Sequence, residues 1–239
     1  MIHQKKERMQ ISVVIPAYNE EGYLKRTIKS LRNQSLKADE IIVVNNNSTD
    51  NTEKVAASLR VKVINEKKKG AGYARKTGFD VSTGDIIITT DADTIFPKDW
   101  LSKIRKTFTD NPKVIAVGGP YKFDTEKHKF AIKLMTRVWI WGDKILNLGN
   151  NIPGVNMAIL KKAYLKTEGF RKKYYEDLDL SLQLKKIGKV VFLKNLVVTT
   201  SYRRYAKKGF LKTVWEYMKN YYKIRFKKSD IHMEDIRKD

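Results

Sequence analysis

The sequence contains no cysteine, and histidine is scarce, with three residues in a chain of 239. The absence of cysteine excludes disulfides, thiolate metal sites and cysteine nucleophiles. The only imidazoles are those of His3, His128 and His232. We therefore expect carboxylates to carry any catalytic or metal-binding chemistry.

Long apolar stretches are also missing. No segment approaches the roughly 20 apolar residues that a bilayer-spanning helix needs. The first ten residues, Met1 to Gln10, are polar and basic and contain no apolar region typical of a secretion signal. These features predict a cytoplasmic protein, either free or attached to the cytoplasmic face of a membrane.

Negative charge is scarce relative to positive charge. The chain has 49 Lys and Arg against 26 Asp and Glu, which gives a formal net charge of +23. Such a surface attracts polyanions, including phosphate-bearing substrates, nucleic acid and anionic lipid headgroups. With 41% hydrophobic and 31% charged residues, the composition is typical of a folded globular protein and not of a disordered one.

The first part of the chain alternates short β-branched runs with segments compatible with helices. This pattern predicts βαβ units and a mostly parallel sheet, which is an α/β fold. The expected strands are Ile11 to Ile15, Ile41 to Val44, Val61 to Ile64 and Ile86 to Thr89.

Two early helices are expected between these strands. The first begins near Asn19 and carries Leu24, Ile28 and Leu31 on one face. The second begins at Ser48 to Asp50, where the residues are typical of helix N-caps. These helices are expected to pack against the sheet.

The second part of the chain is less regular. A helix that ends at about Thr109 is expected, followed by a strand at Val114 to Val117. A long aromatic helix is then expected near His128 to Leu148, followed by a Gly154 to Leu160 segment and a helix from about Tyr175.

Three polar loops follow strands of the predicted sheet: Pro16 to Glu21, Asn45 to Thr52 and Asp91 to Thr94. In an open parallel sheet, ligands bind in the crevice beyond the carboxyl ends of the strands. We therefore expect these loops to converge on one binding site.

Asp91-Ala92-Asp93 directly follows a strand. In an extended segment the two carboxylates would share one side, while Ala92 points away. Mg²⁺ and Mn²⁺ prefer oxygen ligands and often bridge carboxylates to substrate phosphates. The alternative is a solvated turn at the end of a strand, where Asp is common.

The other loops offer contacts for a nucleotide. Tyr18 has a ring suited to stacking on a base, and Asn46 has one donor and one acceptor group for a pyrimidine edge. The run Lys69 to Lys76 combines two glycines with cations suited to a diphosphate. Ordinary turns, helix caps and a solvated charged surface explain the same residues and remain open.

Five motifs occur in the order PAYNEE, NNNSTDNT, GAGYARKTGFDVSTGD, DAD and EDLDLSLQLKKIG. From Ile11 to about Tyr205 this order resembles family 2 glycosyltransferases. The resemblance implies a GT-A fold, a nucleoside diphosphate sugar as donor, Mn²⁺ or Mg²⁺ as cofactor, and inverting transfer to a glycan or lipid-linked acceptor.

The resemblance also implies roles for individual residues. It makes Asp177 the general base, and it makes Asp93 and Asp91 the metal ligands. The implied contacts to the donor sugar or the acceptor are Gly154, Asn156 and Glu176. The implied donor-nucleotide contacts are Pro16, Ala17, Tyr18, Glu20, Asn46, Arg75, Asp91 and Ala92.

The sequence departs from the family pattern in two places. Asn45-Asn46 stands where an acidic pair is often found, so a uracil and a guanine donor both remain open. The late Gln-x-x-Arg-Trp of processive members is absent, and Arg203 and Arg204 stand near its place. This suggests single sugar addition, with these arginines as candidates for a diphosphate clamp.

The expected domains are a basic lead of residues 1–10, a catalytic domain of residues 11–205 and a basic helical extension of residues 206–239. The catalytic domain divides into a nucleotide-binding half, residues 11–95, and an acceptor half, residues 96–205. Trp139 and Trp141 are expected in the core or on a platform for sugar or lipid.

The extension carries an apolar stripe at helical spacing, formed by Leu211, Val214, Trp215, Met218 and Tyr222. Contact with an anionic membrane and docking on the catalytic domain both remain open for this stripe.

Two other functions compete with glycosyl transfer. A sugar nucleotidyltransferase shares the layout, but Ile11 to Glu21 shows no glycine-rich activating loop. Polyanion or nucleic-acid binding fits the charge, yet no nucleic-acid motif is present, and we expect no nucleic-acid partner.

Overall fold

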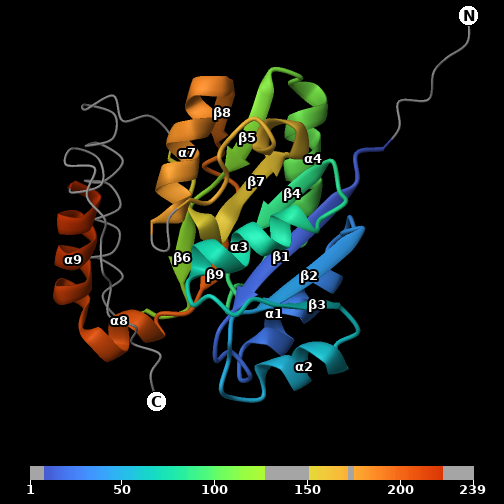
Figure 1. Ribbon diagram of the computed structural model, residues 1–239. Coiled ribbons are helices and arrows are strands. Elements are labelled where there is room, and N and C mark those ends of the chain that lie inside the picture. The colour runs from blue at the N-terminus through green and yellow to red at the C-terminus, as the bar shows by residue number, and fades with distance from the viewer. Residues whose placement is uncertain (1–7, 127–150, 172–174, 223–239) are drawn as a thin grey trace, which may run out of the picture.

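The computed structural model describes residues 8–126, 151–171 and 175–222. In these residues a central sheet has the strand order β3-β2-β1-β4-β7-β5-β8 (Figure 1). Its strands are β1 Ile11–Ala17, β2 Glu40–Asn45, β3 Lys62–Asn65, β4 Ile86–Thr89, β5 Val114–Gly118, β7 Met157–Leu160 and β8 Lys189–Phe192.

The sheet is mostly parallel. Strands β3, β2, β1 and β4 are mutually parallel neighbours. Strand β7 runs antiparallel to β4 and β5, and β8 is parallel to β5. A small second sheet pairs β6 (Tyr121–Phe123) with β9 (Val198–Thr200). The predicted α/β class and the early parallel strands are confirmed.

Helices surround this sheet (Figure 1). Their bounds are α1 Leu24–Arg32, α2 Thr52–Ser58, α3 Ala71–Asp80, α4 Trp100–Asp110, α6 Lys161–Tyr164, α7 Glu176–Ile187, α8 Arg203–Lys208 and α9 Phe210–Tyr222. Every residue of β4 is buried, as expected for a strand covered on both faces. Leu24, Ile28 and Leu31 are at most 1% exposed, which confirms the predicted packing face of the first helix.

The predicted starts of the first two helices are wrong by several residues. Helix α1 begins at Leu24, because Asn19 has a φ of 53° and cannot continue a right-handed helix. The Asn19 side chain instead accepts a hydrogen bond from the Thr49 backbone at 2.9 Å. Helix α2 begins at Thr52, whose backbone N–H donates to Asp50 at 2.9 Å.

The later elements agree with the predicted order. Residues Gly154–Asn156 form a 3₁₀ turn, and β7 follows directly. The predicted aromatic helix at residues 128–148, with Trp139 and Trp141, lies outside the described residues. No helix in the described parts of the chain has the length and apolarity needed to span a membrane.

The C-terminal segment forms two helices where one was expected. Gly209, with a φ of 86°, separates α8 from α9. Helix α8 begins at Arg203, so the predicted domain boundary after residue 205 falls inside this helix.

Glu40 connects several strands at the opposite end of the sheet from the predicted site. Its carboxylate accepts hydrogen bonds from Ser12 Oγ at 2.7 Å, Lys62 Nζ at 3.0 Å and the Thr83 backbone at 3.1 Å. Burial raises the pKa of Glu40, but these donors outweigh it, so the pKa lies below its ordinary value of 4.5. The ionised carboxylate therefore stabilises the fold above that pH.

We expect Glu40→Gln to lower the free energy of unfolding by about 1–2 kcal/mol at neutral pH. The difference from wild type should shrink as the pH falls below 4.5, because Glu40 is protonated first in the unfolded state and, below its lowered pKa, in the folded state too. Urea unfolding at a series of pH values measures this. Glu168→Gln, at a side chain that is 72% exposed, is the control. A pH-independent difference would contradict the electrostatic explanation.

Candidate functional site

The loops that follow β1, β2 and β4 converge at one edge of the sheet, as predicted. The Glu20 backbone N–H donates to Thr52 Oγ1 at 2.7 Å, which joins the first two loops. Thr27 Oγ1 donates to the Ala92 carbonyl at 2.7 Å, which joins α1 to the third loop. The site is therefore built where the carboxyl ends of parallel strands meet.

Asp91 and Asp93 lie in this site, but the expected extended conformation is wrong. The chain turns at Ala92 and Asp93, and Ala92 is 2% exposed. The Asp91 side chain is 43% exposed and accepts a hydrogen bond from Arg75 Nη2 at 2.7 Å. Different chain segments therefore contact the two carboxylates.

Asp93 is the more buried carboxylate, with 12% of its side chain exposed. Thr200 Oγ1 donates to its Oδ1 at 3.0 Å, and Arg203 Nη2 lies 3.1 Å from its Oδ2. Burial and the charge of Asp91 raise the pKa of Asp93, while Arg203 and Thr200 oppose this rise. A divalent cation would favour the ionised form of this carboxylate.

Arg75 connects three parts of the site from helix α3. Its side chain is 6% exposed, and its guanidinium donates to Thr89 Oγ1 at 3.0 Å, to Asp91 and to Glu176. Burial lowers the pKa of Arg75, but the neighbouring carboxylates outweigh this and raise it, so the cation is permanent. Arg75 was predicted near the base or the diphosphate, and it lies beside the Asp91 end of the site.

Glu176 and Asp177 begin helix α7 on the other side of Arg75. Burial raises the pKa of Glu176 to about 7, against the lowering effect of Arg75. Asp177 is half-buried, and its Oδ2 accepts a hydrogen bond from the Gly154 backbone at 2.9 Å. Its Oδ1 accepts another from the Leu178 backbone at 2.8 Å. These donors orient the Asp177 carboxylate at the helix N-terminus.

The absence of a side chain at Gly154 allows its backbone to lie close to Arg75. A Cβ at this position would lie 2.9 Å from the Arg75 guanidinium carbon, which is closer than a side chain tolerates. The Gly154 backbone thus contacts both the buried cation and Asp177.

Arg203 lies on the opposite side of the site from Arg75. It forms ion pairs with Glu20 and Asp93, and its guanidinium carbon lies 4.2 Å from the centre of the Tyr23 ring. Arg204 acts on the same carboxylate, since its charge lowers the pKa of Asp93. Both candidate clamp residues are therefore near the Asp-x-Asp turn.

The predicted base contacts have partners within the protein. Asn46 Nδ2 donates to the Glu66 and Lys68 carbonyls at 3.1 and 2.7 Å, and its Oδ1 accepts from the Gly70 backbone at 2.8 Å. This amide shapes the loop before α3, which is a different role from the predicted pairing with a base. The Tyr18 hydroxyl accepts a hydrogen bond from Lys69 Nζ at 3.1 Å. Pro16 and Ala17 belong to β1.

Asn156 is 1% exposed and has a structural role in place of the predicted sugar contact. Its Oδ1 accepts from Trp100 Nε1 at 2.9 Å. Its Nδ2 donates to the Pro120 and Leu196 carbonyls at 3.2 and 2.6 Å. The side chain joins the end of β5 to α4 and to the loop before β9.

Several residues near the site were missed by the sequence analysis. Tyr121 and Tyr205 share a side-chain hydrogen bond. Tyr205 and the charges of Asp177 and Asp91 raise the pKa of Tyr121, which is 39% exposed. The Phe123 ring joins this pair, 4.8 Å from the Tyr205 ring. Strand β6 has three residues, too few for a recognisable periodic signal.

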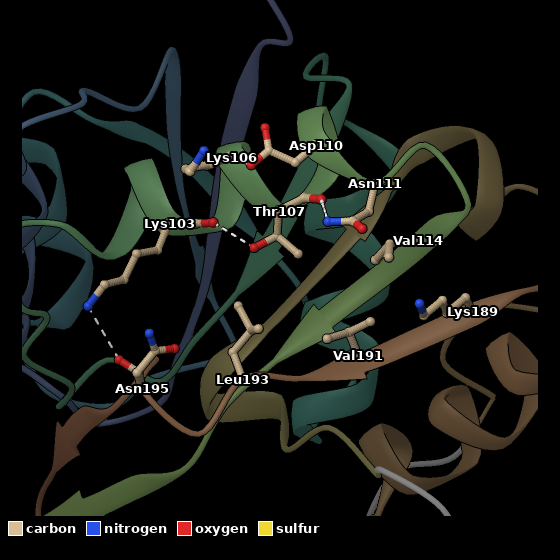
Figure 2. Close-up of a pocket in the computed structure, with 10 residues that line it drawn as sticks. All are labelled: Lys103, Lys106, Thr107, Asp110, Asn111, Val114, Lys189, Val191, Leu193 and Asn195. Atoms are coloured by element: carbon tan, nitrogen blue, oxygen red, sulfur yellow. Dashed lines mark hydrogen bonds and ion pairs between the residues drawn. The ribbon is translucent and has the colours of Figure 1, made fainter.

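A cavity of about 420 Å³ lies elsewhere, between α4 and the edge strand β8 (Figure 2). Lys103, Thr107 and Val191 are among the residues that line it, and Lys103 Nζ donates to the Asn195 carbonyl at 3.4 Å. None of the predicted site residues lines this cavity. The converging loops, and not this cavity, form the candidate site.

The carboxylates of the site suit a cation whose ligands come partly from the protein and partly from a substrate. The described residues contain no group of three or more His, Asp or Glu side chains placed to hold a metal ion. Mg²⁺ is commonly bound through one or two carboxylates together with substrate phosphates. Asp91 and Asp93 fit this mode of binding.

The described residues have the GT-A fold, and the Asp-x-Asp turn lies in the site at the carboxyl ends of its strands. Residues 12–171 match the model of glycosyl transferase family 2, and the chain belongs to this family. It is 25% identical over 175 residues to a glucosyl-dolichyl phosphate glucuronosyltransferase of Haloferax volcanii, covering 68% of this chain and 56% of that protein.

Two solved structures show the same fold. Glucosyl-3-phosphoglycerate synthase from Mycobacterium tuberculosis, in complex with Mn²⁺, UDP and phosphoglyceric acid, matches with a TM-score of 0.63 and 21% identity over 79% of this chain and 69% of that one. Mannosyltransferase PcManGT from Pyrobaculum calidifontis, in complex with GDP-Man and Mn²⁺, matches with a TM-score of 0.64 and 18% identity over 90% and 65%. The chain spans 19–42% of the length of the first curated relatives it matches.

We expect Arg75→Met and Glu176→Met each to lower the free energy of unfolding by about 3–5 kcal/mol, because each leaves a buried charge without its main partner. The loss in free energy of unfolding of the double variant should be about 1–3 kcal/mol smaller than the sum of the two single-variant losses. Urea unfolding of the four proteins gives this coupling energy.

The exposed pair Lys76 and Asp80, on the same helix as Arg75, serves as the control. Its coupling energy should stay below about 0.5 kcal/mol. If the double variant loses the full sum of the two single-variant losses in free energy of unfolding, the ion pair between Arg75 and Glu176 does not hold α3 to α7.

Proposed function

We propose that this protein is an inverting, metal-dependent glycosyltransferase that moves one sugar from a nucleoside diphosphate sugar to an acceptor hydroxyl. The proposal rests on the contacts that the Arg75 side chain makes with two carboxylates. This buried cation contacts both Asp91, at the Asp-x-Asp turn, and Glu176, next to Asp177. A candidate metal ligand and the neighbour of a candidate base thus both contact one buried cation.

The donor diphosphate binds at the Asp-x-Asp turn in this proposal. Asp93 and Asp91 would hold Mn²⁺ or Mg²⁺, which would supply positive charge to offset the charge of the departing nucleoside diphosphate. Arg203 and Arg204 lie beside Asp93 and provide further positive charge for the diphosphate. Because these hard cations prefer oxygen ligands, the diphosphate oxygens would complete a ligand set begun by the two carboxylates.

Asp177 acts as the general base. Its carboxylate takes the proton from the acceptor hydroxyl as the hydroxyl oxygen bonds to the anomeric carbon of the sugar. The bond from that carbon to the diphosphate oxygen breaks on the opposite face, which inverts the configuration. The backbone donors of Gly154 and Leu178 hold the carboxylate in place during this step.

In this proposal, residues other than those around Arg75 determine which nucleotide base and which acceptor bind. Both a UDP complex and a GDP-Man complex occur among the structures that share the fold, so we propose a UDP or GDP sugar as donor. The Haloferax relative is named for a dolichyl phosphate substrate, and we propose a lipid-linked or glycan acceptor. The proposed location is the cytoplasm or the cytoplasmic face of the membrane.

We expect one of UDP, GDP and dTDP to bind in a Mn²⁺-dependent manner, and Asp93→Asn to weaken that binding by at least about tenfold. Isothermal titration calorimetry with and without Mn²⁺ measures this. Asp99→Asn, at a surface carboxylate that is 52% exposed, should bind like wild type. The metal role of Asp93 is wrong if its variant keeps the full Mn²⁺ effect.

We expect Asp177→Asn to reduce turnover of the donor sugar by about 100-fold or more, because the general base is lost. Asparagine has one acceptor oxygen and keeps one of the two backbone hydrogen bonds, from Gly154 or from Leu178. Because position 177 does not contact the nucleotide in this proposal, nucleotide affinity should stay within about twofold of wild type. Release of the nucleoside diphosphate from the donor, with water or a glycan as acceptor, is the readout. Asp110→Asn, at an exposed side chain, is the control, and unchanged turnover in Asp177→Asn would remove the residue from the mechanism.

A further inference from the structure

Helix α9 presents an apolar stripe to solvent. Leu211, Trp215 and Met218 are spaced at i, i+4 and i+7, so they share one helix face. They are 80%, 69% and 52% exposed. The sequence left open whether this stripe docks on the catalytic domain. Leu211, Trp215 and Met218 face solvent, whereas Val214 is half-buried.

The inner side of α9 is held by the chain before it. Thr213 is 3% exposed, and its hydroxyl donates to the Gly209 carbonyl at 2.8 Å. Lys208 pairs with Glu216 at 3.2 Å. These contacts hold α9 against the end of α8, with Leu211, Trp215 and Met218 exposed. Figure 1 shows α9 beyond the small sheet, away from the strands of the central sheet.

Basic residues are frequent in the sequence around the stripe. Between residues 203 and 222 the sequence has six Lys and Arg and one acidic residue, Glu216. Lys212 and Lys219 on α9 are exposed. A nucleic acid would meet the positive charge but would leave the apolar stripe in water. A second copy of the chain would bring one formal charge of +23 against another.

An anionic bilayer satisfies both features, since it offers acyl chains to the apolar side chains and phosphate headgroups to the lysines. We propose that α9 lies in the surface of an anionic membrane, with Leu211, Trp215 and Met218 inserted below the headgroups. Helix α8, which precedes α9, begins at Arg203, and Arg203 contacts Asp93. The bilayer would therefore lie near the site, which suits a lipid-linked acceptor; only this consequence rests on the proposed function.

Flotation of the full chain with vesicles tests the surface. We expect binding to phosphatidylcholine vesicles that contain about one third phosphatidylglycerol, and binding at least about tenfold weaker to phosphatidylcholine alone. Trp215→Glu should weaken binding to the anionic vesicles by at least about tenfold. Leu165→Glu, at an apolar side chain that is 70% exposed but outside the stripe, should bind like wild type.

A labelling experiment locates the inserted face. Because the chain has no cysteine, Met218→Cys and Leu165→Cys can each carry a single environment-sensitive fluorophore. Anionic vesicles should shift the emission to the blue at position 218 and leave position 165 unchanged. An equal shift at both positions, or none at 218, would overturn the proposal.

Two other results would also overturn it. One is equal vesicle binding by wild type and Trp215→Glu. The other is a dimer that forms without lipid and is lost in Trp215→Glu, since the stripe would then be an interface between copies. Thermal unfolding shows whether each variant folds. If the wild-type protein binds nucleotide but no anionic vesicles, only the membrane proposal is wrong. If it binds the vesicles but no nucleotide, only the transferase mechanism is wrong.

Discussion

The structure of the site depends on the burial of one permanent positive charge. The Arg75 guanidinium does not deprotonate in proteins, and only 6% of its side chain is exposed. A buried cation of this kind requires carboxylates close by. Glu176 and Asp91 meet this requirement, although Glu176 is 101 residues away from Arg75 in the chain. The ion pairs therefore fix where α7 begins relative to β4.

A second arginine repeats this arrangement at the other carboxylate of the turn. Arg203 contacts Asp93 and Glu20, as Arg75 contacts Asp91 and Glu176. The acidic pair of the Asp-x-Asp turn is thus divided between two cations from different parts of the chain. This division offsets the repulsion between the two carboxylates and leaves positive charge on both sides of the space proposed for a diphosphate.

Much of the fold was predictable because local patterns decide it. The β-branched runs became buried parallel strands, since a strand covered by helices on both faces needs apolar residues throughout. The packing face of α1 followed from helical spacing alone. The start of that helix did not, because Asn19 adopts a left-handed conformation to bond with Thr49, a partner in another loop. The break at Gly209 was missed because apolar spacing alone does not show where a helix ends.

The sequence by itself determined the α/β class and the family, because periodicity and ordered motifs are properties of short segments. Only the tertiary structure decided how the amides of Asn46 and Asn156 are used, since their partners are backbone groups brought close by folding. It likewise decided that Tyr121 and Tyr205 meet beside Asp177, and that the apolar stripe of α9 faces solvent. The same side chain can bind a ligand, a backbone group or nothing, and which of these occurs depends on neighbours that lie far away in the sequence.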